Sequence, residues 1–323
     1  MNRTQLMLGG LLLVQIVLIL ILYSPFSGAT AGIESRPLLP ALEAVTPSRL
    51  EIQGADDGVL TLLKQAGEWR VDDLDGFPAD GQKVDDLLRD LEQLTVRRPV
   101  VSSDRYHAAF KVTEDEHEAR IRLWEEAADE PDVDLIVGSS PNFRSSHVRV
   151  AGDDAVYEVR GLSPYDVRPD SASWIDKNLV DADEARVVGL KLTNESGSFE
   201  LEKQDGVWKV ISPAASADRE LDAGKAQALI RALSSIRLSD GAGPLDEAAH
   251  GLAPPAATLV LRLAPDEGQE GAESELTVNV GGQVEDNESQ RYITRSSFGF
   301  TGIVWESSVR QLLEKTLDEL YGS

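Results

Sequence analysis

The sequence has 323 residues, 41% of them hydrophobic, with no cysteine and a formal net charge of −25 at pH 7. This length supplies enough apolar material for a membrane segment and two domains, each with its own core. The lack of cysteine excludes disulfides, thiolate metal sites and a cysteine nucleophile, and the negative charge argues against nucleic acid and anionic lipid headgroups as partners.

The N-terminal segment predicts a single membrane crossing. The run from Leu6 to Tyr23 is apolar and uncharged, and its eighteen residues make a helix of about 27 Å, close to the hydrocarbon thickness of a bilayer. Arg3 precedes the run, whereas the first charge after it is Glu34, so the N-terminus is expected in the cytoplasm. Residues 1–23 are therefore interpreted as a cytoplasmic tip and anchor in a bacterial inner membrane, with a periplasmic remainder. The small-residue motif Ala29 to Ala31 leaves open a cleavable signal peptide, which would export the same domains.

The next 25 residues, 24–48, contain four prolines and no period, and they are interpreted as a tether. Two units follow, over residues 49–183 and 184–323. Each unit opens with three short alternating segments, which predicts an antiparallel meander. Asp80 and Asp222 then stand where the N-cap of an amphipathic helix is expected.

The two units repeat one motif. Lys64 to Val71 returns as Lys203 to Val210, and the apolar stripe of the first predicted helix returns in the second. The repeated glycines and tryptophans, which are Gly67, Trp69, Gly206 and Trp208, are interpreted as structural anchors at a turn and against a helix. Each unit is expected to end in a strand that carries a tyrosine, Tyr157 or Tyr292, followed by a helix, the last from Val309 to Leu320 with a capping box at Ser308. The fold class is thus α+β, with two tandem repeats that each pack a mostly antiparallel sheet under an amphipathic helix.

These repeated motifs resemble a bacterial domain-of-unknown-function family. Members of that family carry one N-terminal membrane segment and are often encoded beside gliding-motility-type ABC transporter components. The resemblance covers nearly everything after the tether, in two copies. It implies membrane complexes, above all ABC transporter subunits, as partners, and it supplies no catalytic residues.

The residues themselves show no catalytic motif. The four histidines, which are His107, His117, His147 and His250, lack the spacing of a metal site and are expected at surface or turn positions. No phosphate-binding glycine loop is present, and no cofactor is expected. The loop around Phe143 and Arg144 has no counterpart in the second unit and is a candidate interface, because interfaces favour aromatic and arginine side chains.

The leading hypothesis is therefore a non-enzymatic, membrane-anchored accessory or scaffold protein of an ABC-type transporter complex. An envelope protein that binds a ligand, such as a glycan, is the alternative. A hydrolase with an unrecognised site comes third.

Overall fold

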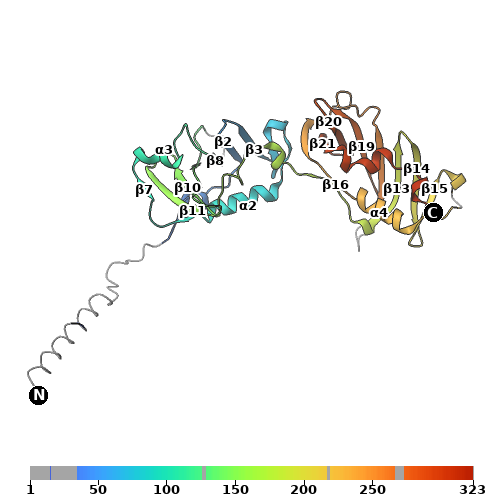
Figure 1. Ribbon diagram of the computed structural model, residues 1–323, viewed down its shortest axis with the longest axis horizontal. Helices are drawn as coiled ribbons and strands as arrows, with labels where there is room; N and C mark the ends of the chain where they lie inside the picture. The colour runs from blue at the N-terminus through green and yellow to red at the C-terminus, as the bar shows by residue number, and fades with distance from the viewer. Residues whose placement is uncertain (1–14, 16–34, 126–128, 217–218, 266–272, 323) are drawn as a thin grey trace, which may run out of the picture.

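The protein is described by a computed structural model, which covers residue 15 and residues 35–125, 129–216, 219–265 and 273–322. Two units lie end to end, each built on one large antiparallel sheet (Figure 1). Within the described ranges no helix is long and apolar enough to cross a membrane. The predicted anchor from Leu6 to Tyr23 falls outside those ranges except for Gln15.

The first sheet has nine strands. Their spatial order is β5 (Phe77–Pro78), β4 (Glu68–Val71), β3 (Val59–Gln65), β2 (Arg49–Gly54), β8 (Ala119–Trp124), β9 (Val133–Val137), β10 (Ser145–Val150), β11 (Ala155–Arg160) and β7 (Val101–Ser102). Two short helices accompany it: α2 (Gly81–Glu92) and α3 (His107–Phe110).

The second sheet has eight strands that follow the same order from its meander outwards. They are β15 (Val207–Ser212), β14 (Gly197–Gln204), β13 (Val187–Asn194), β18 (Ala257–Leu263), β19 (Ser274–Val284), β20 (Asn287–Arg295), β21 (Phe300–Trp305) and β17 (Asp240–Pro244). Its helices are α4 (Ala223–Leu233) and α5 (Arg310–Glu314). The mostly antiparallel α+β fold predicted from the sequence is confirmed.

Local chemistry explains why the meanders and helices form where they do. Asp205 and Gly206 both have positive φ, at 52° and 82°, which is the backbone of the tight hairpin turn between β14 and β15. Asp80 and Asp222 accept a hydrogen bond from the backbone N–H of Lys83 and Lys225, each at 3.0 Å, so both predicted N-caps are confirmed.

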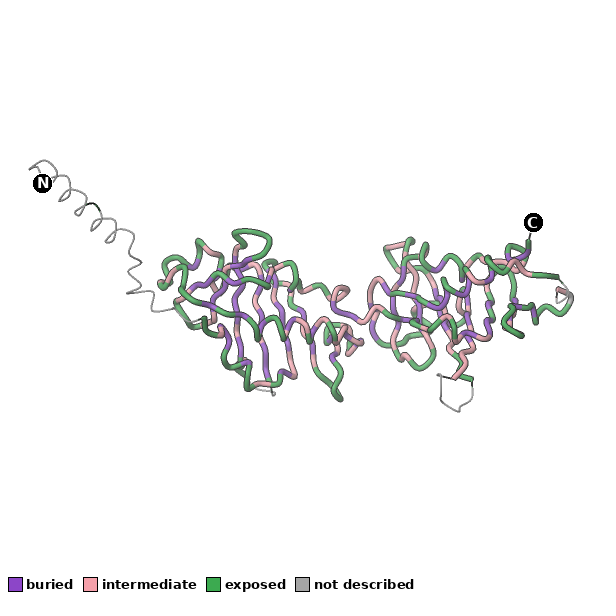
Figure 2. Tube along the Cα trace, turned by 90° about the horizontal axis from the view of Figure 1, so that it is seen from below, coloured by how far each residue is buried: buried purple, intermediate pink, exposed green. Residues whose placement is uncertain are grey.

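The core of each unit lies between its sheet and its main helix. In Figure 2 the buried residues run along the strands, and the exposed ones gather at turns and loops. Val84 and Leu91 of α2 are fully buried, as are Ala226 and Ile230 of α4. The apolar stripes read from the sequence therefore face the sheets, as predicted.

Part of the predicted tether is folded onto the first unit. β1 (Arg36–Pro37) pairs with β6 (Thr95–Val96), and Leu38, Leu39 and Leu42 are at most 7% exposed. Pro37 ends β1 and Pro40 begins a 3₁₀ turn, Pro40–Glu43. Burying each of the leucines stabilises the fold by about 2 kcal/mol.

The second unit likewise begins earlier than residue 184. β12 (Asn178–Asp181) pairs with β16 (Ser235–Arg237) of the second unit, as β1 pairs with β6 in the first. The first unit ends instead at Trp174 and Ile175: Trp174 O accepts the N–H of Asp80, and Ile175 bridges to Ala79. Only Asp176 and Lys177 separate these contacts from β12.

The predicted C-terminal helix from Val309 to Leu320 is broken in two. α5 ends at Glu314, Lys315 is extended with ψ of 129°, and a short 3₁₀ turn covers Asp318–Leu320. The side-chain amide of Asn194 donates to the carbonyls of Leu312 and Lys315, which satisfies groups that a continued helix would have bonded. The expected capping box is absent, because the Ser308 hydroxyl donates to the Trp305 carbonyl. The first unit has no terminal α-helix and closes in a 3₁₀ turn at Ser171–Ser173.

Candidate functional site

The four repeat anchors lie in the cores and in the hairpin turns of the two units. Trp69 and Trp208 are 4% and 8% exposed, and each lies in the core between sheet and helix. Gly67 and Gly206 hold positive φ values of 89° and 82° in the hairpin turns before them. Neither tryptophan presents its ring to bulk solvent.

The four histidines are more buried than predicted, and they lie apart. His107 is 8% exposed and its Nε2 lies 3.0 Å from Asp154 O, whereas His117 is 6% exposed with no hydrogen-bond partner for either ring nitrogen among the described residues. His147 and His250 are half-buried and contact a serine and a threonine hydroxyl at 3.0 Å. Among the residues that the structure describes, no three His, Cys, Asp or Glu side chains are grouped to hold a metal ion.

The two tyrosines matched from the sequence are on non-equivalent strands. Tyr157 is on β11, the next-to-last strand of its sheet, whereas Tyr292 is on β20 and stacks on His250 with ring centroids 4.3 Å apart. By strand order, β20 corresponds to β10, whose His147 packs edge-on against Phe110 at 4.6 Å. The aromatic pairs are thus equivalent, although the residue types differ. Sequence alignment on a shared tyrosine could not detect this.

The predicted interface loop is highly exposed. The side-chain amide of Asn142 donates to Ser145 Oγ, and its oxygen accepts the N–H of Arg144, which fixes a tight turn. Phe143 at the tip of this turn is fully exposed, at 101%. In the second unit the equivalent connection, between β19 and β20, is the short hairpin around Asp286.

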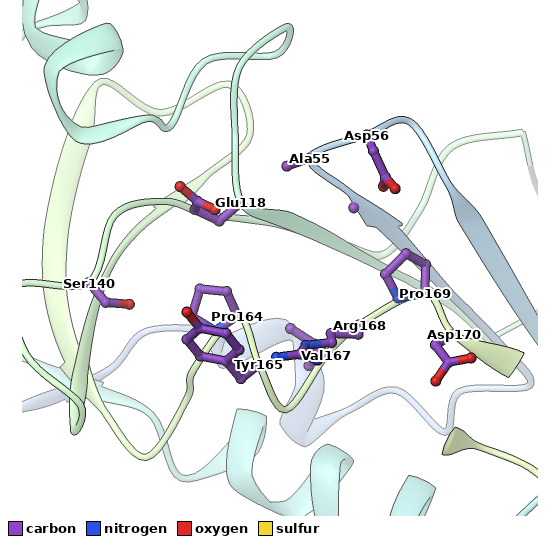
Figure 3. Close-up of a pocket in the computed structure, with 11 residues that line it drawn as sticks. Ala55, Asp56, Glu118, Ser140, Pro164, Tyr165, Val167, Arg168, Pro169 and Asp170 are labelled. Carbon is purple, nitrogen blue, oxygen red and sulfur yellow. The ribbon is translucent and has the colours of Figure 1, made fainter. Parts of the chain in front are cut away.

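A pocket of about 550 Å³ opens on the first unit (Figure 3). It lies where the end of β2, the start of β8 and the segment 164–170 meet. Gly54 is required there, because a side-chain carbon at this position would come within 2.8 Å of Pro169. Sequence motifs give no sign of this pocket, since its walls come from four separate segments.

The pocket combines a ring surface with carboxylates. In Figure 3 the rings of Pro164 and Tyr165 lie at its centre, with the carboxylates of Asp56, Glu118 and Asp170 around it. Tyr165 is 71% exposed, and the guanidinium of Arg168 lies over its ring at 4.7 Å. Such a site presents hydrogen-bond acceptors beside a stacking surface, and no group in it has the paired geometry of a recognised catalytic motif.

The joint between the units is a third feature. Phe77 of β5 is completely buried and meets Phe298 and Phe300 of the second unit edge-on, with ring centroids 5.5 and 5.3 Å away. β17 packs across the same contact, where a side chain at Gly241 would come within 3.0 Å of Leu74. We call this contact the aromatic joint.

Charged groups surround the aromatic joint. Burial raises the pKa of Asp240 above its ordinary value, although its Oδ1 accepts the N–H of Gly241 at 2.7 Å, and the nearby charge of Asp170 acts in the same direction. Burial lowers the pKa of Lys83, whose ammonium lies 4.2 Å from the Trp174 ring centroid and donates to Ser173 O. The aromatic contacts of the joint therefore lie near two charged groups, Asp240 and Lys83, that are partly buried.

The fold and these features define a two-unit α+β protein with candidate binding surfaces. The family described as Domain of unknown function (DUF4340) matches residues 69–255, more than half of the chain, and the chain belongs to this family. The match begins at Trp69 and continues into the second unit. A search of curated proteins finds no match to the chain, and a search of solved structures finds none either.

Proposed function

We propose that this chain is a non-enzymatic accessory or scaffold protein of the bacterial envelope. One N-terminal helix anchors it in the inner membrane, and its two units, which are two copies of the family domain, lie on the periplasmic side beside an ABC-type transporter complex. The apolar run before Glu34 and the family membership support this proposal. The choice of an ABC-type transporter as the partner rests on the resemblance to the family alone.

The observation that carries the proposal is the aromatic joint. Two units linked by two residues would swing freely if nothing packed between them, because small domain interfaces leave relative motion as the default. Here three phenylalanines and a glycine contact across the joint. A fixed, elongated arrangement holds the second unit at a set distance from the anchor, which suits a scaffold.

The test is co-purification from the native membrane. The full chain with a C-terminal tag is extracted in mild detergent, beside a chain that lacks residues 1–23. If transporter subunits are recovered in stoichiometric amounts with the full chain and are not recovered with the truncated chain, the proposal is supported. Recovery of the full chain by itself, at a detergent concentration that keeps a known transporter intact, contradicts it.

The pocket at Tyr165 favours ligand binding as a second function. A ring surface flanked by carboxylates suits a polyhydroxylated ligand such as a glycan, since carboxylates accept hydroxyl hydrogen bonds and the ring packs on the sugar face. Saturation-transfer NMR with oligosaccharides tests this on the full chain. Signal that is lost in Tyr165→Ala and retained in Phe143→Ala supports the pocket, whereas equal signal in all three chains excludes it.

A further inference from the structure

Four exposed arginines gather at one end of the first unit. They are Arg97, Arg98, Arg144 and Arg160, and we call them the basic corner. Within the described part of the chain none of the four guanidinium groups forms an ion pair, whereas Arg120, Arg122 and Arg149 of the same unit all do. A net charge of −25 makes such a group of unpaired cations unexpected.

The strand pairing brings these residues together. Arg160 ends β11 and lies opposite Ser145, so Arg144 is beside it, and both line one groove of about 390 Å³. On the other side of β11, Val100 donates its N–H to Val156 O, which places Arg97 and Arg98 along the second half of that strand. Among the residues that the structure describes, the acidic groups at this place are Glu158 on β11 and Asp166 in the groove.

Exposed apolar side chains accompany the arginines. Phe143 is fully exposed beside Arg144, and Val100 is 45% exposed after Arg98. Arginines interspersed with a projecting aromatic residue are the composition of surfaces that lie at the headgroup level of a bilayer.

The basic corner lies where the chain enters the first unit. Arg36 pairs with Val96, the residue before Arg97, and its guanidinium donates to Tyr157 Oη at 2.7 Å. Strands β7, β10 and β11 form the end of the first unit that points away from the second (Figure 1). Between Tyr23 and Arg36 there are twelve residues, 24–35, which reach about 45 Å at most when fully extended.

We propose that the basic corner contacts anionic headgroups of the membrane that anchors the chain. The inference rests on the anchor of the proposed function. The net charge does not oppose the contact, because exposed charges more than about 10 Å apart are largely screened at 0.1 M salt. The contact orients the two-unit rod on the membrane surface, and Phe143, predicted from the sequence as part of a protein interface, packs among the lipids.

The test uses the absence of cysteine, which makes any introduced cysteine unique. Full chains with Val100→Cys or, at the distant strand β15, Val207→Cys are labelled with a fluorophore. They are reconstituted in nanodiscs of phosphatidylcholine, alone or mixed equally with phosphatidylglycerol, that carry a headgroup nitroxide quencher. The test variant changes the four arginines of the basic corner to glutamine. A control with the same charge change replaces Lys209, Arg231, Arg237 and Arg310 of the second unit by glutamine.

We expect stronger quenching at position 100 in anionic than in neutral discs, and no such difference at position 207. Each arginine contributes about a fivefold change to the contact equilibrium. The basic-corner variant, or about 1 M salt, should therefore abolish the difference, while the control variant keeps it.

If the quenching at position 100 is equal in anionic and neutral discs, the inference is overturned, whereas the proposed membrane anchor is unaffected. Shielding of position 100 by added transporter subunits in neutral discs also overturns it, in favour of a protein interface. If the chain is incorporated into neither anionic nor neutral discs, both the inference and the proposed anchor are overturned. A chain that joins anionic discs alone supports the basic corner and contradicts the anchor.

Discussion

The aromatic joint gives the sharpest prediction. Phe300→Ala removes one ring contact across the joint, with Phe77 at 5.3 Å, and one inside the second unit, with Phe298 at 5.8 Å. Each aromatic pair contributes about 0.5–1.5 kcal/mol beyond its buried area, and the half-buried side chain adds about 1 kcal/mol. Only the contact with Phe77 crosses the joint, so the substitution should weaken the contact between the units by about 1.5–2.5 kcal/mol, which is a factor of about 13 to 70 in the docked population.

The assay is a distance measurement across the joint. Spin labels on Glu92→Cys at the end of α2 and Ala232→Cys in α4 report one unit each, because the chain has no other cysteine. The parent chain should give a narrow distance distribution and Phe300→Ala a broad one, whereas Phe143→Ala, which touches no joint residue, should leave it narrow. A narrow distribution in Phe300→Ala, with both units still folded by circular dichroism, would refute the reasoning.

Three further predictions concern stability. Asp80→Ala and Asp222→Ala each remove a helix cap and should each lower the free energy of unfolding by about 1 kcal/mol in urea titrations, and no change would mean that the caps are not formed in solution. Because burial raises the folded-state pKa of Asp240, its contribution to stability is complete below the unfolded pKa and is lost as pH rises through the folded pKa. Asp240→Asn should therefore have a higher melting temperature than the parent chain at pH 7 and the same melting temperature near pH 3. A lower melting temperature of the variant at pH 7 would contradict the burial of this carboxyl group. Gly138→Ala and Gly281→Ala would press a methyl group onto the carbonyls of Phe110 and His250, so each should lower the melting temperature far more than Gly81→Ala, at the start of α2 where a side chain meets nothing.

The sequence was a good guide wherever local chemistry decides the structure. Asp80, Asp222 and the Asp205-Gly206 turn act through neighbours within four residues, so their roles follow from short motifs. The apolar stripes of α2 and α4 also follow, since a helix periodicity shows which face is buried.

The sequence could not reveal features that depend on distant segments. Leu38 and Leu39 join the core because β6 lies nearly sixty residues later, and the break after Glu314 is stabilised by Asn194, more than a hundred residues away. The pocket at Tyr165 likewise needs Gly54 and Glu118 from other strands. Phe143 and Arg144 were detected as unusual in the sequence, but the other arginines around them became neighbours only through the pairing of β11.

The short connection at Asp176 and Lys177 has a consequence for the order of events during synthesis. The contacts that close the first unit are available once Asp176, whose N–H donates to Pro78 O, has been made, whereas Phe298 follows 122 residues later. At about 5–20 residues per second, the ribosome needs roughly 6–25 s to reach it. During that time Phe77, which is completely buried in the finished protein, has no partner from the second unit, so the nascent chain carries an apolar spot that chaperones can recognise.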